Sequence, residues 1–154
     1  MLFRSQLEKL SDNKPKEQVE YENFVAKFKK PAFISSGPLK GLKKVSQLRH
    51  DDPIKEFVVA RKIPNSYHAK LFACPNFMRY INTIIPGKFS EAALKHDEAR
   101  LLIPFIDDKG NVHALQGRSL NKNSDIKYIT VVLNEEIPKI YGLDTLDRDK
   151  TTYV

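Results

Sequence analysis

The stretch Arg100-Leu-Leu-Ile-Pro-Phe-Ile-Asp-Asp-Lys-Gly-Asn-Val-His-Ala-Leu-Gln116 decides the fold class of this chain. Two short apolar runs flank the turn-forming residues Asp108–Asn111, a pattern that predicts an antiparallel β-hairpin. Proline has no N–H to donate to a neighbouring strand. Pro104 therefore predicts that its strand lies at a sheet edge or carries a bulge.

Further strands are predicted downstream of the hairpin. Residues 126–133 are rich in β-branched side chains, and 139–142 form a shorter extended piece. Thr151–Val154 has the composition of the beginning of another strand. Because the sequence stops inside this apolar run, it suggests a truncated or split reading frame.

Upstream of the hairpin, apolar residues recur at helical spacing. The clearest helix begins with Asp52 as N-cap and Pro53 at the first helical position. Ile54, Phe57 and Val58 then form its apolar face. Other helices are predicted at 2–10, 16–30, just after Asn65, and at 76–83.

The pattern as a whole predicts an α+β fold, with a helical N-terminal half followed by a small antiparallel β-rich subdomain. Residues 1–50 are interpreted as a basic helical connection and 51–154 as one subdomain. Residues 1–50 hold 11 basic and 5 acidic side chains, most of the net charge of +7. Attraction to phosphate, or to an acidic partner, should be strongest there, and a solvated basic surface with no partner is the alternative.

Composition excludes several classes of protein. The 154 residues are 41% hydrophobic and 29% charged, which is typical of one globular domain. No apolar run reaches the roughly 18–20 residues of a membrane span, and the N-terminus has no secretory signal pattern, so a cytoplasmic location is predicted. A single cysteine, Cys74, excludes an internal disulfide and a Cys-rich zinc module.

The remaining candidate ligands give weak signals. The four histidines lack metal-ligand spacing, and Cys74 has no evident histidine partner. Asp107 and Asp108 lie in a turn sequence, which favours a structural role over a metal site. The same holds for the acidic residues Asp144, Asp147 and Asp149.

A more informative group follows the hairpin. Gly117 and Arg118 end one predicted strand, and Lys127 and Tyr128 begin the next. Neighbouring strand ends would put both cations on one rim, where Gly117 permits close backbone approach and Tyr128 can stack on a base. This rim suits phosphates or a single-stranded nucleic acid. The alternative is that these are ordinary surface side chains of a hairpin, with no binding role.

The order of motifs along the chain resembles that of Toprim-type DNA primases, most closely those encoded by phages. The similar pieces, in chain order, are Pro53–Pro64, Leu71–Pro75, Arg100–Phe105, Asp107–Gly110, Gln116–Arg118, Lys127–Thr130 and Ile140–Leu143. The first departs from the family in having Phe57-Val58 where Tyr-Leu is usual. The resemblance covers 52–154.

The resemblance implies the N-terminal subdomain of a primase RNA polymerase core, which forms one wall of the groove for template and nucleotides. It implies that Arg118 and Lys127 contact phosphates, with Arg100 a weaker candidate. The implied partners are single-stranded DNA, ribonucleoside triphosphates and a replicative helicase. For a phage protein the location would be the host cytoplasm.

The resemblance also places the chemistry of the parent enzyme outside this sequence. The Mg²⁺-binding Toprim carboxylates would lie beyond Val154, and the zinc module would lie upstream. Nucleotidyl transfer relies on two metal ions, so the chain is expected to be inactive alone. Two alternatives remain open: a non-catalytic module that binds single-stranded nucleic acid, and a helicase-docking protein.

Overall fold

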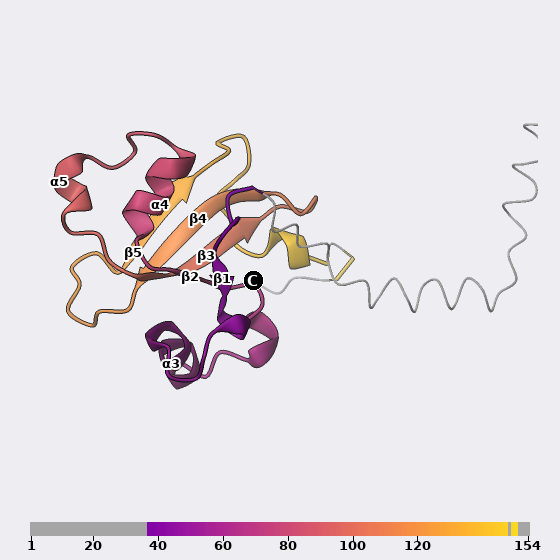
Figure 1. Ribbon diagram of the computed structural model, residues 1–154. Coiled ribbons are helices and arrows are strands. Elements are labelled where there is room, and N and C mark those ends of the chain that lie inside the picture. The colour runs from indigo at the N-terminus through magenta and orange to yellow at the C-terminus, as the bar shows by residue number, and fades with distance from the viewer. Residues whose placement is uncertain (1–36, 148, 151–154) are drawn as a thin grey trace, which may run out of the picture. The chain divides into compact units, whose positions relative to one another are not determined.

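Five antiparallel strands form one sheet in the computed structural model, which describes residues 37–147, 149 and 150 (Figure 1). Strand order follows chain order: β1 Lys43–Lys44, β2 Phe72–Cys74, β3 Arg100–Ile106, β4 Val112–Ser119 and β5 Tyr128–Val132. The described residues all belong to the compact unit Ile34–Val154. The helices predicted at 2–10 and 16–30 and the strand predicted at 151–154 lie outside the described residues.

The predicted hairpin is confirmed as β3 and β4. Arg100 lies opposite Ser119, and Pro104 opposite Leu115, with a register shift between Phe105 and Ile106. Strand β2 begins at Phe72, opposite Leu102, and pairs with β3 only from Leu102 back to Arg100, so β3 has a strand neighbour on only one side at Pro104. The proline thus occupies a locally unpaired strand side close to a bulge, as its missing N–H requires.

Helix α3, Pro53–Ala60, has the predicted beginning. The Asp52 carboxylate accepts a hydrogen bond of 2.9 Å from the Ile54 N–H, and Pro53 opens the first turn. Ile54 and Val58 are buried and pack into a cluster with one face of the sheet. The other buried members of that cluster are Val45, Leu71, Ala73 and Leu101.

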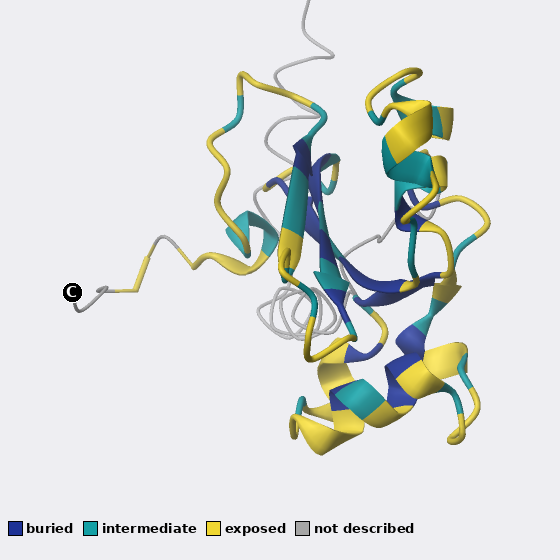
Figure 2. Ribbon diagram, turned by 90° about the vertical axis from the view of Figure 1, so that its left-hand side faces the viewer, coloured by how far each residue is buried: buried dark blue, intermediate teal, exposed yellow. Residues whose placement is uncertain are grey.

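Helix α4, Phe77–Ile84, packs beside the opposite face, and the short helix α5, Glu91–Leu94, follows it (Figure 1). Asn76 makes no side-chain cap for α4. The Asp97 carboxylate instead accepts hydrogen bonds of 2.8 and 2.9 Å from the N–H groups of Met78 and Arg79. Buried residues are concentrated in the strands and on the sides of the helices that face them (Figure 2).

Three single-turn 3-10 helices complete the secondary structure of the described residues: η1 Val45–Gln47, η2 Asn65–Tyr67 and η3 Leu143–Thr145. The turn of helix predicted after Asn65 is confirmed as η2. The strand predicted at 139–142 is wrong, because Tyr141 and Gly142 form a turn. Gly142 has φ of 88°, which directs the chain into η3 instead of along the sheet.

The fold is mixed α+β, as predicted. Its described residues before the hairpin carry both helices and the strands β1 and β2. Strand β1 pairs with β2, so the sheet begins before residue 51, where the sequence interpretation set the start of the subdomain. Within the described part of the chain, no helix is both long enough and apolar enough to cross a membrane.

Candidate nucleic-acid interface

The two faces of the sheet differ in what covers them. Side chains alternate between faces along a strand, and directly paired residues of antiparallel strands share a face. Gly117 faces α4, whereas Gln116 and Arg118 lie on the other face of β4. Their partners across the strand pair are Thr130 and Tyr128.

Arg118 and Tyr128 form a stacked pair at one end of the sheet. The guanidinium carbon lies 4.3 Å from the centroid of the tyrosine ring. Tyr128 is 52% exposed and Arg118 is half-buried. Within the described residues the guanidinium makes no hydrogen bond or ion pair, and its Nε is buried without a partner. The cation therefore has no internal acceptor in this part of the chain.

Lys127 lies at the same end of the sheet. Its carbonyl accepts a hydrogen bond of 2.9 Å from the Ser119 N–H, which extends the β4–β5 pairing by one residue. Its half-buried side chain bends back along the loop, and Nζ donates to the Lys122 carbonyl. The structure thus brings Arg118, Tyr128 and Lys127 to one end of the sheet.

Arg100 is placed differently, because its side chain is only 3% exposed. Its Nη2 lies 2.6 Å from a carboxylate oxygen of Glu98. Its Nη1 donates to the carbonyls of Gly117 at 3.2 Å and Ile126 at 3.1 Å. These bonds hold the Arg100 guanidinium inside the fold, against the backbone that immediately precedes Arg118 and Lys127.

Gly117 has an internal packing role. A Cβ at this position would lie 2.6 Å from Cε2 of Phe77, a ring that is fully buried. Real Cβ atoms do not come this close to carbon, so the absence of a side chain lets α4 sit directly on β4.

A groove lies beside the Arg118–Tyr128 pair. Its volume is about 600 Å³, and it has three exposed tyrosines along its sides, Tyr67, Tyr128 and Tyr141. The remaining lining residues are Ile63, Pro64, Leu71, Ile103, Phe105 and Gln116. Except for Tyr128, sequence reasoning did not find these residues as a site. No pattern in the sequence links the three tyrosines, which are far apart along the chain.

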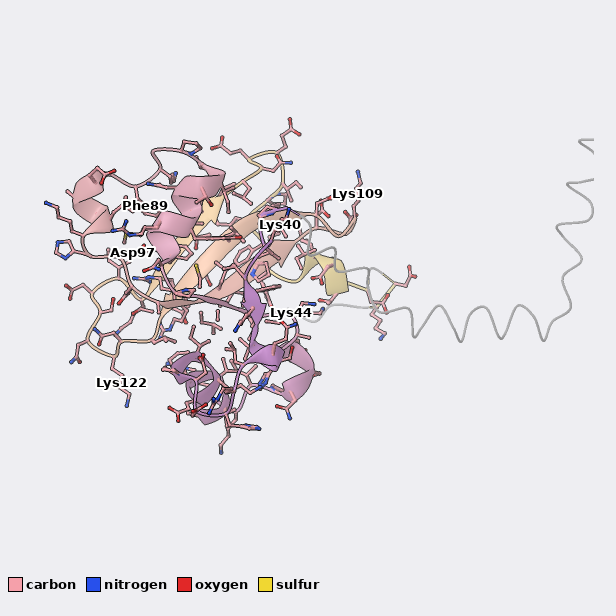
Figure 3. All side chains as sticks on the ribbon, viewed as in Figure 1. Lys40, Lys44, Phe89, Asp97, Lys109 and Lys122 are labelled. Atoms are coloured by element: carbon pink, nitrogen blue, oxygen red, sulfur yellow. The ribbon has the colours of Figure 1, made fainter. Side chains whose placement is uncertain are left out.

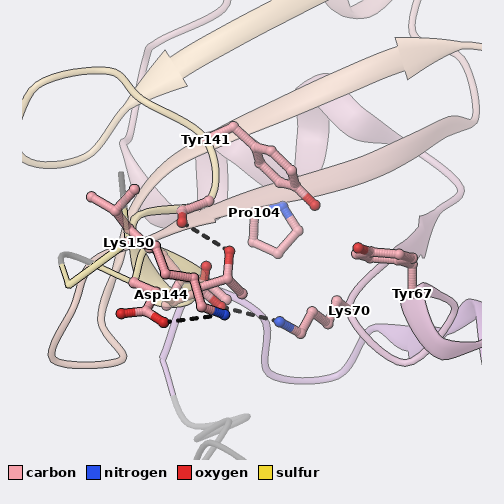
Figure 4. A pocket seen from close by; sticks show the side chains of 11 residues that line it. Tyr67, Lys70, Pro104, Tyr141, Asp144 and Lys150 are labelled. Carbon is pink, nitrogen blue, oxygen red and sulfur yellow. Dashed lines mark hydrogen bonds and ion pairs between the residues drawn. The ribbon is translucent and has the colours of Figure 1, made fainter. Parts of the chain in front are cut away.

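A second cleft of about 460 Å³ shares Tyr67 and Tyr141 with this groove (Figure 4). Lys70 Nζ lies 3.3 Å from an Asp144 carboxylate oxygen, and Lys150 pairs with Asp147 at 3.4 Å. Burial raises the pKa of the Tyr141 hydroxyl, and the nearby Asp144 and Tyr67 add to the effect. The hydroxyl therefore stays protonated near neutral pH and can donate a hydrogen bond.

Nucleophilic and metal chemistry have little basis among the described residues. Burial, with a further contribution from Asp97, raises the pKa of the Cys74 thiol to about 12, which keeps it protonated. The Asp107 carboxylate accepts hydrogen bonds from Lys109 and Asn111 as the predicted turn residue. In residues 37–147, 149 and 150, no three Asp, Glu, His or Cys side chains are grouped as metal ligands, so these residues do not fit a magnesium pair.

Comparison with known proteins gives one informative similarity. No family model matches the sequence. Over 111 residues the chain is 33% identical to the DNA primase of Enterobacteria phage T4. The chain is related to a DNA primase. The primase relationship expected from the motif order is thus confirmed at this level. The aligned segment is 72% of this chain but 31% of the phage primase, so the chain spans under a third of that relative's length.

Proposed function

We propose that this chain is part of a DNA primase that makes short RNA primers on single-stranded DNA during DNA replication. Its contribution is the surface that binds the template strand and ribonucleoside triphosphates, in the N-terminal subdomain of a Toprim-type polymerase core. The observation that carries the proposal is the similarity to a phage primase over most of the chain. The exposed Arg118–Tyr128 stack supports the location of the surface.

The chemistry of this end of the sheet suits a single strand. Arg118 has no carboxylate partner among the described residues, so its Nη donors remain available for phosphate oxygens. Lys127 supplies a second cation, and the exposed Tyr128 ring offers a stacking surface for a base. Arg100 and Gly117 support this surface from inside the fold, because their neighbours are Glu98 and Phe77.

Binding of labelled single-stranded DNA to the purified chain, measured by fluorescence anisotropy at several salt concentrations, tests this surface. For single strands, each phosphate contact contributes about 0.7 to the slope of log affinity against log salt. Arg118→Ala and Lys127→Ala should each lower the slope by about that amount. Lys109→Ala is the matched control, because exposed Lys109 lies at the other end of β4, far from the Lys122 loop (Figure 3). A double variant that binds like the wild type would show that the surface is misassigned.

We also propose that the chain does not synthesise primers by itself. Primer synthesis requires metal-binding carboxylates, which the family resemblance places beyond Val154. Bound metal ions would activate the attacking hydroxyl and stabilise the leaving pyrophosphate. Incubating the purified chain with single-stranded DNA, ribonucleoside triphosphates and Mg²⁺ tests this proposal. Any oligoribonucleotide product would contradict it.

A second candidate is docking to a replicative helicase through the basic segment 1–50. The excess of 11 basic over 5 acidic side chains there favours an acidic partner. Absence of DNA binding at every salt concentration, with retained binding to a helicase, would favour docking over template binding. DNA binding without primer synthesis, even when the rest of a primase is added, would favour a non-catalytic module.

A further inference from the structure

The groove beside the Arg118–Tyr128 pair has a lining that differs from the rest of the proposed interface. We call it the tyrosine groove and define it by the nine lining residues given above. None of the nine carries a charge. Its volume, about 600 Å³, lies within the range of about 300–1,000 Å³ that is usual for small-molecule sites.

The three rings of the tyrosine groove come from separate parts of the chain. Tyr67 ends η2, Tyr128 begins β5, and Tyr141 precedes η3. All three are about half exposed, at 48%, 52% and 53%. The hydroxyl ends of Tyr67 and Tyr141 point toward one another beside the Pro104 ring (Figure 4). Rings from three parts of the chain thus surround one hollow on the face of the sheet opposite α4.

The floor of the groove is firmly held. Phe105 packs edge-on against Tyr141, with ring centroids 5.6 Å apart. The Gln116 amide nitrogen donates to the Thr130 hydroxyl at 2.9 Å, which leaves its carbonyl oxygen as an acceptor at the groove. The site therefore offers aromatic faces, one fixed amide acceptor and tyrosine hydroxyls, but no cation.

This lining fits a flat, uncharged aromatic group with polar edges, and a nucleobase has that chemistry. A phosphate does not fit, because the groove contains no positive charge to receive it. Arg118 lies over Tyr128, and Tyr128 also lines the groove. The groove is thus continuous with the proposed phosphate-binding surface.

We infer that the tyrosine groove binds bases of the same single strand whose phosphates Arg118 contacts. The inference rests on the proposed function and deepens it by assigning base stacking to Tyr67 and Tyr141. The strand lies with its bases against the sheet and its backbone at the Arg118 end. Since every base has a π-face, such stacking tolerates any sequence.

The test compares two oligonucleotides of equal length and charge, one normal and one with abasic sites along its central part. Stacking on an aromatic side chain changes affinity by roughly 5- to 150-fold per base. The full chain should therefore bind the normal strand at least 5-fold more tightly than the abasic strand. Equal affinity for the two strands would overturn the inference and leave the phosphate surface intact. Failure to bind either strand at low salt would overturn both proposals.

Tyrosine variants locate the effect. Tyr67→Leu and Tyr141→Leu keep apolar volume but remove the ring, so they should weaken binding of the normal strand, leave the abasic strand unaffected and preserve the salt slope. Val59→Ala is the control, because Val59 is exposed on α3 and lies outside the groove lining. Equal weakening of both strands would contradict base stacking.

A measurement on the unmodified chain covers the case in which a tyrosine variant fails to fold. An oligonucleotide with 2-aminopurine at its centre loses fluorescence when that base stacks on an aromatic ring. Binding of the wild-type chain should quench the central probe and leave a probe at the far end of a longer strand unchanged. Binding without quenching at any probe position would contradict the inference.

Discussion

Arg118 and Tyr128 lie directly opposite each other on β4 and β5, with the guanidinium 4.3 Å from the ring centroid. The contact is thus set by strand register, and not by a flexible loop. A planar guanidinium over an aromatic face is held in one orientation while its edges stay available for hydrogen bonds. The pair therefore presents a cation in a fixed position at the end of the sheet.

Tyr128→Ala should weaken single-stranded DNA binding by roughly 1–3 kcal/mol, because it removes a stacking surface and the support of Arg118. Combined with Arg118→Ala, its effect should be non-additive by about 0.5–1 kcal/mol, the range for an exposed cation–π contact. Tyr128→Phe, which keeps the ring, is the control. A double-mutant cycle of binding free energies measures the coupling, and strictly additive losses would contradict the role of the stack.

Arg100→Ala should reduce the free energy of unfolding by about 3–5 kcal/mol, because it leaves Glu98 and the carbonyls of Gly117 and Ile126 without their donor. Arg100→Lys should reduce the free energy of unfolding by a smaller amount, since it keeps the positive charge. Urea denaturation measures both. The salt slope of DNA binding by Arg100→Lys should equal that of the wild type. A slope lowered by about 0.7 would instead show that Arg100 contacts a phosphate directly, as the family resemblance implied.

Gly117→Ala should reduce stability by about 1–3 kcal/mol, because the new methyl group overlaps the Phe77 ring. In a Phe77→Leu background, Gly117→Ala should reduce stability by a smaller amount, since the smaller leucine side chain leaves room for the new methyl group. Urea denaturation of the two single variants and the double variant measures this coupling. An equal cost in both backgrounds would show that the Phe77 ring is not what Gly117 accommodates.

The Asp107 carboxylate should make the stability of the fold depend on pH in the acid range. Burial alone would raise the pKa of its carboxyl, but hydrogen bonds from Asn111 and Lys109, with nearby His113, hold the pKa below its usual value. The folded carboxyl thus binds a proton less readily than the unfolded one. The stabilisation is complete above the unfolded pKa of about 3.9 and is lost as pH falls through the folded pKa.

Asp107→Asn should accordingly lower stability at pH 7, and its difference from the wild type should shrink below about pH 4. Urea midpoints at pH 7 and pH 3 provide the measurement. Asp125→Asn is the control, because exposed Asp125 makes no side-chain hydrogen bond within the described residues. A difference that stayed constant over this pH range would contradict the proposed role of the Asp107 carboxylate.

Local signals predicted the parts of the fold that local chemistry determines. The turn sequence between β3 and β4 and the Asp52-Pro53 beginning of α3 both formed as predicted. Strands β1 and β2 have two and three residues, and α5 has four, which is too short for any periodicity to show. The cap of α4 comes from Asp97, and only the folded chain brings that carboxylate to the N–H groups of Met78 and Arg79.

The candidate site was predicted in part. Strand ends placed Arg118 and Tyr128 near each other, and the register then set the stack. The internal partners of Arg100 could not be predicted, because they depend on the path of the loop at Ile126. The tyrosine groove was also hidden, since its rings are distant in sequence and come together only through the fold.

The strand order has a consequence for how the sheet assembles. Every strand pairs only with strands next to it in the chain, so each pairing closes one intervening loop. That loop has five residues between β3 and β4, against 25 between β2 and β3. The shorter closure costs about 1.4 kcal/mol less in chain entropy. Loop closure therefore favours the β3–β4 hairpin as the nucleus of folding, and in pulsed hydrogen exchange its amides should be the first to gain protection.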